Sequence, residues 1–572
     1  MATEATQAHW LSRYAKNYYR WRTDVDEEGR TTFKRPHGLV ENFFSYDGTD
    51  REGRADISFG LTLDLKHQRL TYAQLRLKVL LAWASLRLQH VLLMSRVVEE
   101  GPEKQRSFVI GVPENVNQVV REAKQNLSFL EERGTAVDLN DFYHHCANTA
   151  RVLDASKCLS RLFVLPWEQR GEGEATLKLV LTVGHEISDG MSTYHWMSHF
   201  IRLLNTKKYQ LLENLKKHCM HTEIESRLPV AQEDLYPQIP GSKARQRWFW
   251  AIARILRHVR RPLPAGFENP LQNEQRTFPT LEPKYSDVLD YSEERRPPLK
   301  TGHCLIQLPP SAFQNLREIT RNAGGTVGAA CFALVALAMM ELEEERHPNV
   351  SLAERKPMII SFPLNPKPYF GYNKPSESCM LSFGSSFTLP FLSSELDKVG
   401  RFRLLLKQCQ RKLGMYQKRI RSPSEKLSLA AYSPSRLLAS GYIAQLDGGW
   451  NMKRPNGLRR SPFNPQGDYP SSKDPSWSTN GVSSVGSLKH FFDDKAHSVP
   501  VQERSWDLEA RWKNSRSGVR AREGEFLVGS MTLPYGLIFS VSYDASIMDE
   551  EWVGKWKEKM ETLLLPESGA RL

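Results

Sequence analysis

The sequence lacks the cysteine patterns of disulfide-bonded and zinc-binding proteins. Its seven cysteines in 572 residues are dispersed at positions 146, 158, 219, 304, 331, 379 and 409, and none stands in C-x-x-C spacing. An odd, scattered set is typical of free thiols in a reducing compartment. We therefore predict no disulfide framework and no metal site.

Signals for export or membrane insertion are also missing. The amino terminus, Met1 to Ala5, lacks the basic and apolar regions of a secretory signal. The longest apolar run, Val327 to Met340, is too short to span a bilayer. We expect a cytoplasmic protein with no transmembrane segment. The tripeptide Ala570-Arg571-Leu572 has the form of a peroxisomal address, so import into peroxisomes is the alternative location.

Acidic residues are fewer than basic ones, and the formal net charge is +13. The basic residues are dispersed apart from one segment, Lys243 to Arg261, so we expect no nucleic-acid partner. That segment also carries Trp248, Phe249 and Trp250, which predicts an amphipathic helix. The helix either packs by one face against the protein or contacts a membrane surface or an anionic ligand.

Hydrophobic periodicity predicts a mixed α/β protein in two halves. We expect a first half over residues 1–220, a connecting segment over 221–300 that contains the amphipathic helix, and a second half over 301–572. Density in Gly, Pro, Ser and Asn predicts a loop insertion at about 447–480. The helices predicted outside the connecting segment include one that begins at Thr71 with a capping box to Gln74, one over Glu114 to Arg133, and an apolar one over Val327 to Leu342.

The most informative stretch runs from Leu177 to Ser192. A buried-type strand, Leu177 to Val183, leads into His185-x-x-x-Asp189-Gly190, and Ser192 is predicted to cap a helix over Thr193 to Leu204. With 16 histidines in the chain, about one His-x-x-x-Asp spacing is expected by chance. His185 is therefore either a general base held at a strand end or a core histidine in a strand-to-helix turn.

Short motifs recur in order along nearly the whole chain: Arg35 to Glu41, the helix with Trp83 and Gln89 to Leu93, His185 to Gly190, Ser361 to Pro366, Val482 to Gly486, Ser542 to Asp544, and Met548-Asp549. Together they resemble the chloramphenicol-acetyltransferase-like superfamily, which includes plant BAHD acyltransferases and peptide-synthetase condensation domains. More specifically, they resemble fungal trichothecene 15-O-acetyltransferases. The resemblance implies two acetyltransferase-like halves, each a mixed sheet flanked by helices, with an active-site tunnel between them.

The resemblance also implies roles for the residues of the motif. His185 would be the catalytic base, and Asp189, the second catalytic-motif residue, would pair with a basic residue on an Asn-x-Arg-like segment. The matching segment here is Asn365-Pro366-Lys367, so Lys367 would be the partner, and lysine lacks the bidentate fork of arginine. Gly190 would let substrate or backbone approach closely, or would serve only as a helix-start glycine.

The Asp-Phe-Gly-Trp-Gly motif of plant BAHD enzymes has no counterpart in this sequence, so the oxyanion donor must be sought elsewhere. Ser483 and Ser484 lie on the strand that borders the tunnel in relatives. They are candidates for substrate binding through a hydroxyl or backbone donor, or they simply pair within a sheet.

We therefore expect an acyl-CoA-dependent O-acyltransferase, first of all an O-acetyltransferase, that acts on a hydroxyl of a hydrophobic fungal metabolite such as a sesquiterpenoid or polyketide. Acetyl-CoA or another acyl-CoA would be a cosubstrate, a small-molecule alcohol the acceptor, and no cofactor would stay bound. We expect a monomer. Two alternatives are a condensation-type enzyme that takes its acyl group from a carrier protein, and a catalytically silent binding or scaffold protein.

Overall fold

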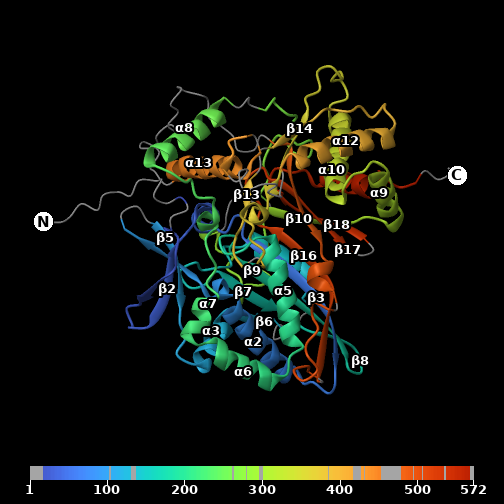
Figure 1. Cartoon of the computed structure of the whole chain (residues 1–572). Helices are drawn as coiled ribbons and strands as arrows, with labels where there is room; N and C mark the ends of the chain where they lie inside the picture. Colours follow the sequence, from blue (N-terminus) through green and yellow to red (C-terminus); the bar gives the residue numbers. More distant parts are fainter. Residues whose placement is uncertain are drawn as a thin grey trace.

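The computed structural model describes most of the chain, and Figure 1 shows its arrangement. The described residues are 14 and 17–566, except 102–104, 131–136, 260–262, 279, 296–299, 376, 384–385, 417–426, 431, 453–477, 494, 506 and 534–535. The tripeptide Ala570-Arg571-Leu572 and most of the predicted loop at 447–480 lie outside these ranges. The blue to teal part of the chain forms most of one lobe, and the yellow to red second half forms most of the other, where the green helix α8 (Lys243–His258) also lies (Figure 1).

The first lobe is built on a sheet of order β16-β3-β9-β7-β6, with β8 also paired to β9. Its strands are β3 (Ile57–His67), β6 (Leu127–Phe129), β7 (Ser160–Val164), β8 (Glu168–Gly171), β9 (Glu174–Val183) and β16 (Leu508–Val519). The helices of this lobe are α2 (Tyr72–Gln89), α3 (Val116–Gln125), α4 (Leu139–Asn148), α5 (Gly190–Leu204), α6 (Lys208–His218) and α7 (His221–Ser226). β3 and β9 are apolar along most of their length because they are buried on both faces.

The second lobe contains a sheet of order β10-β18-β17-β15-β11-β14. Its strands are β10 (Thr301–Gln307), β11 (Met358–Ser361), β14 (Phe387–Leu389), β15 (Asn480–Ser487), β17 (Phe526–Leu533) and β18 (Gly536–Asp544). Its helices are α9 (Pro310–Asn322), α10 (Val327–Arg346), α12 (Lys398–Gly414) and α15 (Glu550–Thr562). Every residue of α10 from Ala329 to Met340 is buried, which confirms the prediction made from its apolar run.

One strand connects the two lobes. β16 belongs to the sequence of the second half, yet it pairs antiparallel with β3 from Leu508 opposite His67 to Val519 opposite Ile57. The backbone amide of Val519 also donates to Ser542 Oγ of β18 at 3.0 Å. The sheet of the first lobe is therefore completed by residues that come more than half a chain later.

Smaller elements surround this frame. A separate sheet has the order β1 (Arg22–Val25), β2 (Thr31–Pro36), β5 (Gln105–Gly111), β4 (Arg96–Glu100), and β12 (Pro363–Leu364) pairs with β13 (Ser382–Phe383). The remaining helices are α1 (Leu39–Ser45), α8 (Lys243–His258), α11 (Lys367–Phe370), α13 (Pro434–Met452) and α14 (Lys489–Phe492). α13 takes up the first six residues of the predicted loop at 447–480, so that part of the prediction is wrong.

The amphipathic helix forms as predicted and packs by one face. In α8, Phe249, Trp250 and Ala253 are buried against α13, next to Tyr442. Trp248, on another face of α8, is 67% exposed. The packing of one face against the protein is therefore confirmed, and contact of the other face with a membrane or an anion stays a prediction.

Two further helix predictions had different outcomes. Thr71 caps α2, and its amide donates to Gln74 Oε1 at 2.8 Å, which confirms the capping box. The helix predicted over Glu114 to Arg133 ends at Gln125 instead. Leu127–Phe129 forms a parallel pair with β7, so sheet pairing overrides the local helical pattern there.

Within the described ranges, no single helix is both long and apolar enough to cross a membrane. α9 and α10 meet that test only as a pair, and the pair is bent by 114°. α10 is a buried helix of the second lobe, which is the ordinary reason for such hydropathy in a globular core.

Candidate active site

His185 lies in the turn between β9 and α5, as the sequence predicts. β9 ends at Val183, and the amide of Gly184 donates to Leu159 O at 2.9 Å, which fixes the start of the turn. A Cβ on Gly184 would lie only 2.4 Å from Glu186 Oε2, so a larger residue at this position would displace the Glu186 carboxylate. His185 is half-buried as a residue, whereas Glu186 and Ile187 are fully buried.

The turn is held from behind by a buried ion cluster. Arg151 donates to both carboxylate oxygens of Asp56, at 2.8 and 2.9 Å, and lies 3.5 Å from Glu186 Oε1. Burial raises the pKa of Glu186, and the Arg151 guanidinium opposes that rise. Because these groups are desolvated and mutually bonded, they hold the residue after His185 in one position.

Asp189 is the N-cap of α5. Its Oδ1 accepts from the amide of Ser192 at 2.8 Å, and Ser192 Oγ in turn accepts from the amide of Asp189 at 2.8 Å. The prediction that Ser192 caps a helix beginning at Thr193 is therefore wrong, because the helix begins at Gly190 and Ser192, its third residue, completes a capping box with the N-cap Asp189. The second oxygen, Oδ2, accepts from the amide of Met380 at 3.3 Å and so ties α5 to a loop of the second half.

Lys367 acts on Asp189 through the electrostatic field. Burial raises the pKa of Asp189, hydrogen bonds from Ser192 and Met380 lower it, and Lys367 lowers it further. The Lys367 ammonium group donates to Lys374 O at 2.9 Å. The pairing of Lys367 with Asp189 stays a prediction, and the backbone amides of Ser192 and Met380 and the Ser192 hydroxyl donate hydrogen bonds to the Asp189 carboxylate.

The imidazole of His185 stacks on a phenyl ring. The centroids of His185 and Phe44 are 3.7 Å apart and the planes differ by 5°. On the same ring of Phe44 lies the guanidinium of Arg522, 5.5 Å from its centroid. Arg522 is held by Asp47 at 2.8 Å and by Glu525 at 3.2 Å. This stack fixes the plane of the imidazole.

The edge of the imidazole meets a thiol. Cys379 Sγ lies 3.8 Å from His185 Nδ1, and burial keeps the pKa of that thiol well above its usual value, so it stays protonated. Burial lowers the pKa of His185 from 6.5 to about 4; backbone hydrogen bonds at His185 itself and at Ser188 oppose the shift, and the charge of Arg522 adds to it. His185 is therefore neutral at physiological pH, which is the form that can accept a proton.

The remaining predicted residues lie on the neighbouring strand β15. A Cβ added to Gly190 would be 4.0 Å from Val485 Cγ2, so the start of α5 lies against this strand. Ser483 pairs with Gly529 and Ser484 pairs with Ser530 in β17. Ser484 is exposed and Ser483 is half-buried, and their part in oxyanion binding stays a prediction.

Sequence reasoning missed Phe44, Cys379 and Arg522 as neighbours of the histidine. Each comes from a different segment, and Cys379 is 194 positions away from His185 along the chain. Phe44 follows the Arg35 to Glu41 stretch, so that stretch was the one local signal that pointed near it.

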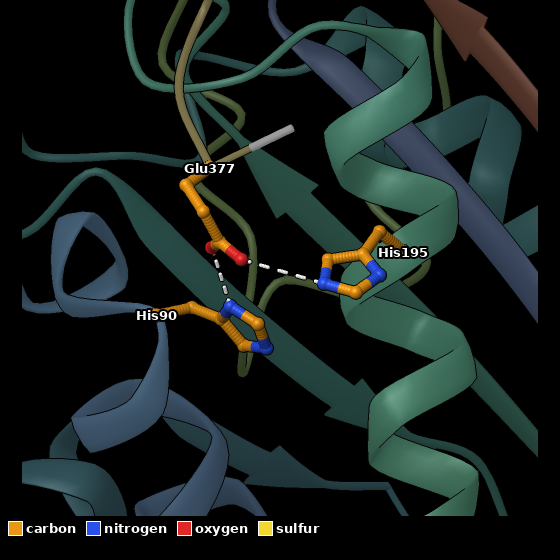
Figure 2. A group of neighbouring side chains, drawn as sticks. All are labelled: His90, His195 and Glu377. Atoms are coloured by element: carbon orange, nitrogen blue, oxygen red, sulfur yellow. Dashed lines mark hydrogen bonds and ion pairs between the residues drawn. The ribbon is translucent and has the colours of Figure 1, made fainter. Parts of the chain in front are cut away.

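A second group of histidines lies farther along α5 (Figure 2). Glu377 Oε2 is 2.6 Å from His90 Nδ1, and Glu377 Oε1 is 3.3 Å from His195 Nε2. His90 Nε2 is 2.8 Å from His199 Nδ1, and the indole nitrogen of Trp196 donates to Glu377 Oε2 at 3.3 Å. The sequence predicts no metal site, yet these three donor residues could hold a cation.

Comparison with known proteins gives matches at the level of structure. No protein-family model and no curated protein sequence matches the chain. The solved structure of the trichothecene 15-O-acetyltransferase TRI3 from Fusarium sporotrichioides aligns over 96% of this chain and 97% of its own, with a TM-score of 0.66 and 12% identity. The condensation domain of the Monacolin K polyketide synthase MokA aligns over 93% and 96%, with a TM-score of 0.50 and 10% identity.

The chain has the two-lobed fold of these acetyltransferase and condensation enzymes. The expected fold class, two halves that each hold a mixed sheet flanked by helices, is thereby confirmed. Identity this low defines the fold alone, so the activity has to be argued from the site.

Proposed function

We propose that the protein is an acyl-CoA-dependent O-acyltransferase, first of all an O-acetyltransferase. The observation that carries this proposal is His185, a half-buried residue whose neutral imidazole is fixed between β9 and α5 next to a loop of the second half. The similarity in fold to TRI3, a trichothecene 15-O-acetyltransferase by name, supports it. The acceptor would be a hydroxyl of a hydrophobic fungal secondary metabolite, such as a trichothecene-like sesquiterpenoid or a polyketide.

The chemistry follows from a neutral imidazole. His185 takes the proton of the acceptor hydroxyl as the oxygen attacks the thioester carbonyl. The tetrahedral intermediate then collapses, the carbon–sulfur bond breaks, and the imidazolium gives its proton to the departing thiolate. Acyl-CoA and alcohol become ester and free CoA, and no acyl-enzyme forms. Placing both substrates at one base removes part of the barrier through orientation.

The other motif residues act by position. Asp189 caps α5 and holds Met380, so it keeps the turn that carries His185 against the loop with Cys379. Ser483 or Ser484 would supply the oxyanion donor from β15, which lies against the start of α5. Gly190, which lies against β15 at the start of α5, would leave room for substrate there.

The test is release of free CoA from acetyl-CoA with a panel of sesquiterpenoid and polyketide alcohols. We expect His185→Ala to lose about 10²-fold or more in rate, because general base catalysis supplies a factor of this size. His347→Ala is the matched control, since His347 is an exposed histidine at the end of α10. An unchanged rate in His185→Ala would refute the role of His185.

A carrier-dependent condensation enzyme is the second candidate. Two observations favour it: the fold is similar to that of the MokA condensation domain, and Lys243, Arg245 and Arg247 are exposed on α8, where an acidic carrier protein could dock. The two candidates are separated by offering the same acyl group on CoA and on a carrier protein. Strict dependence on the carrier would replace the first proposal by the second.

A further inference from the structure

The cluster at His90, His195 and Glu377 joins three distant segments. His90 follows the last residue of α2, His195 lies on α5, and Glu377 lies in the loop between α11 and β13 of the second half. In Figure 2 both imidazoles point toward the carboxylate between them. One donor atom from each residue lies within 4.8 Å of the other two.

We infer that His90 Nδ1, His195 Nε2 and a carboxylate oxygen of Glu377 form a binding site for a divalent transition-metal ion of the zinc type. Two imidazoles and one carboxylate are a known donor set for Zn²⁺, with a fourth position left for water or another ligand. Bonds of about 2.0–2.1 Å in a tetrahedral arrangement place donor atoms roughly 3.3 Å apart. Glu377 Oε1 lies at this separation from His195 Nε2, at 3.3 Å. Glu377 Oε2 lies at a hydrogen-bond distance of 2.6 Å from His90 Nδ1, so metal binding requires the side chains to rotate and this pair to move apart.

The surroundings of the three donors fit such a site. Histidines that bind metals usually use their second ring nitrogen in a hydrogen bond that fixes the ring. His90 Nε2 meets His199 Nδ1 at 2.8 Å, which leaves Nδ1 of His90 facing Glu377. Trp196, next to His195 on α5, donates to Glu377 Oε2 and orients the carboxylate.

An ion here would connect the two halves of the chain close to His185. Cys379, two residues after Glu377, touches His185 Nδ1, and the amide of Met380 donates to Asp189 Oδ2. The ion would thus fix the loop that borders the imidazole. Glu377, His90 and His195 are positioning residues in this view, and metal binding itself does not depend on the proposed transferase activity.

The alternative is a cluster that works without metal. The same atoms are already linked by hydrogen bonds between Glu377 and the two histidines, and these could hold the loop alone. Metal uptake by the protein separates the two cases, and it needs no substrate.

The experiment uses the full chain without a histidine tag, stripped with a chelator and titrated with Zn²⁺ by calorimetry, with metal content measured after gel filtration. We expect one equivalent of Zn²⁺ in the wild type. Glu377→Gln and His195→Gln should each weaken binding by more than the ~10–100-fold that loss of an outer partner costs, and His199→Gln by about that factor. Co²⁺ in place of Zn²⁺ should give visible absorption bands in the wild type that disappear in both ligand variants.

His347→Gln is the matched control, because His347 Nε2 faces Glu343 at 3.8 Å on the surface and should bind as the wild type does. His195 is only partly buried, so His195→Gln decides the matter if Glu377→Gln fails to fold. A wild type that takes up no equivalent of Zn²⁺, or uptake that is equal in the wild type and both ligand variants, would overturn the proposal. If His185→Ala loses transferase activity but still takes up Zn²⁺, the metal site is shown to be independent of the proposed catalytic base.

Discussion

Two histidine environments lie near α5, one around His185 before its first turn and one around His90 and His195 farther along it. They differ in their charged neighbours. His185 contacts a phenyl ring and a protonated thiol, and the cation Arg522 lowers its pKa further. His90 and His195 share the carboxylate of Glu377. Burial disfavours the protonated ring in the first environment, whereas a fixed anion organises the second. The first is therefore suited to accept a proton, and the second to hold a cation.

Replacing one histidine from each environment should change the rate of CoA release by very different factors. His185→Asn should lower kcat/KM for CoA release by about 10²-fold or more, because the base is lost. His195→Gln should lower it by less than about tenfold, because it acts only through the loop with Cys379. Steady-state kinetics of both variants provide the measurement. Equal losses would show that the two environments do not have separate roles.

The second expected effect is on acid stability. Burial lowers the pKa of His185 from 6.5 to about 4, so between these values the unfolded chain binds a proton that the folded chain does not. The contribution is fully present above pH 6.5, and the free energy of unfolding falls below it by up to about 1.4 kcal/mol per pH unit. The pKa values of His90 and His199 are also lowered, so these two residues make the free energy of unfolding depend more steeply on pH.

Urea unfolding at pH 7 and pH 5 measures this loss. His185→Asn removes one of the titrating groups, so its stability should fall less steeply over the same range. The idea of a buried neutral imidazole fails if both proteins lose stability equally.

A smaller effect is expected at Asp189. Asp189→Ala removes the N-cap of α5 and the acceptor of the Met380 amide, at a cost of about 1–2 kcal/mol in the free energy of unfolding. Asp189→Asn keeps a capping oxygen, so it should cost only a few tenths of the free energy of unfolding that Asp189→Ala costs. Chemical denaturation of both variants gives the comparison. If Asn is as costly as Ala, the charge facing Lys367 is what stabilises the site.

The smallest effect is expected at Gly190. A Cβ there would stand 4.0 Å from Val485, an ordinary contact, so Gly190→Ala should change the free energy of unfolding by no more than about 0.5 kcal/mol. Chemical denaturation of Gly190→Ala measures the change in the free energy of unfolding. The rate of CoA release by the same variant then separates the two possible roles of Gly190. A lowered rate at unchanged stability means that Gly190 leaves room for substrate, and an unchanged rate means that it only starts the helix.

Features encoded within a short stretch could be predicted from the sequence. The strand before His185, the capping box at Thr71, the amphipathic α8 and the buried α10 depend on residues within one or two turns or on one alternating run. The cap of α5 was misplaced by three residues, because Asp189 and Ser192 are both good capping residues and only the backbone distinguishes them.

Features that depend on distant contacts could not be predicted. Nothing near His90 indicates Glu377, which is 287 positions away, and the neighbours Phe44 and Cys379 of His185 are likewise brought in by the fold. The stretch Leu127–Phe129 has a helical pattern and yet becomes a strand, because β7 offers it a partner. Pairings of this kind depend on the whole topology.

β16, the strand that connects the two lobes, limits when the first sheet can form as the chain is synthesised. The first sheet needs Leu508–Val519 at the edge of β3, so it cannot be completed until residue 519 has left the ribosome. Until then β3 presents an unpaired edge, which other chains can join. A fragment that carries the histidine motif but stops before residue 508 should therefore aggregate, and attempts to produce the first lobe alone should include β16 on a linker.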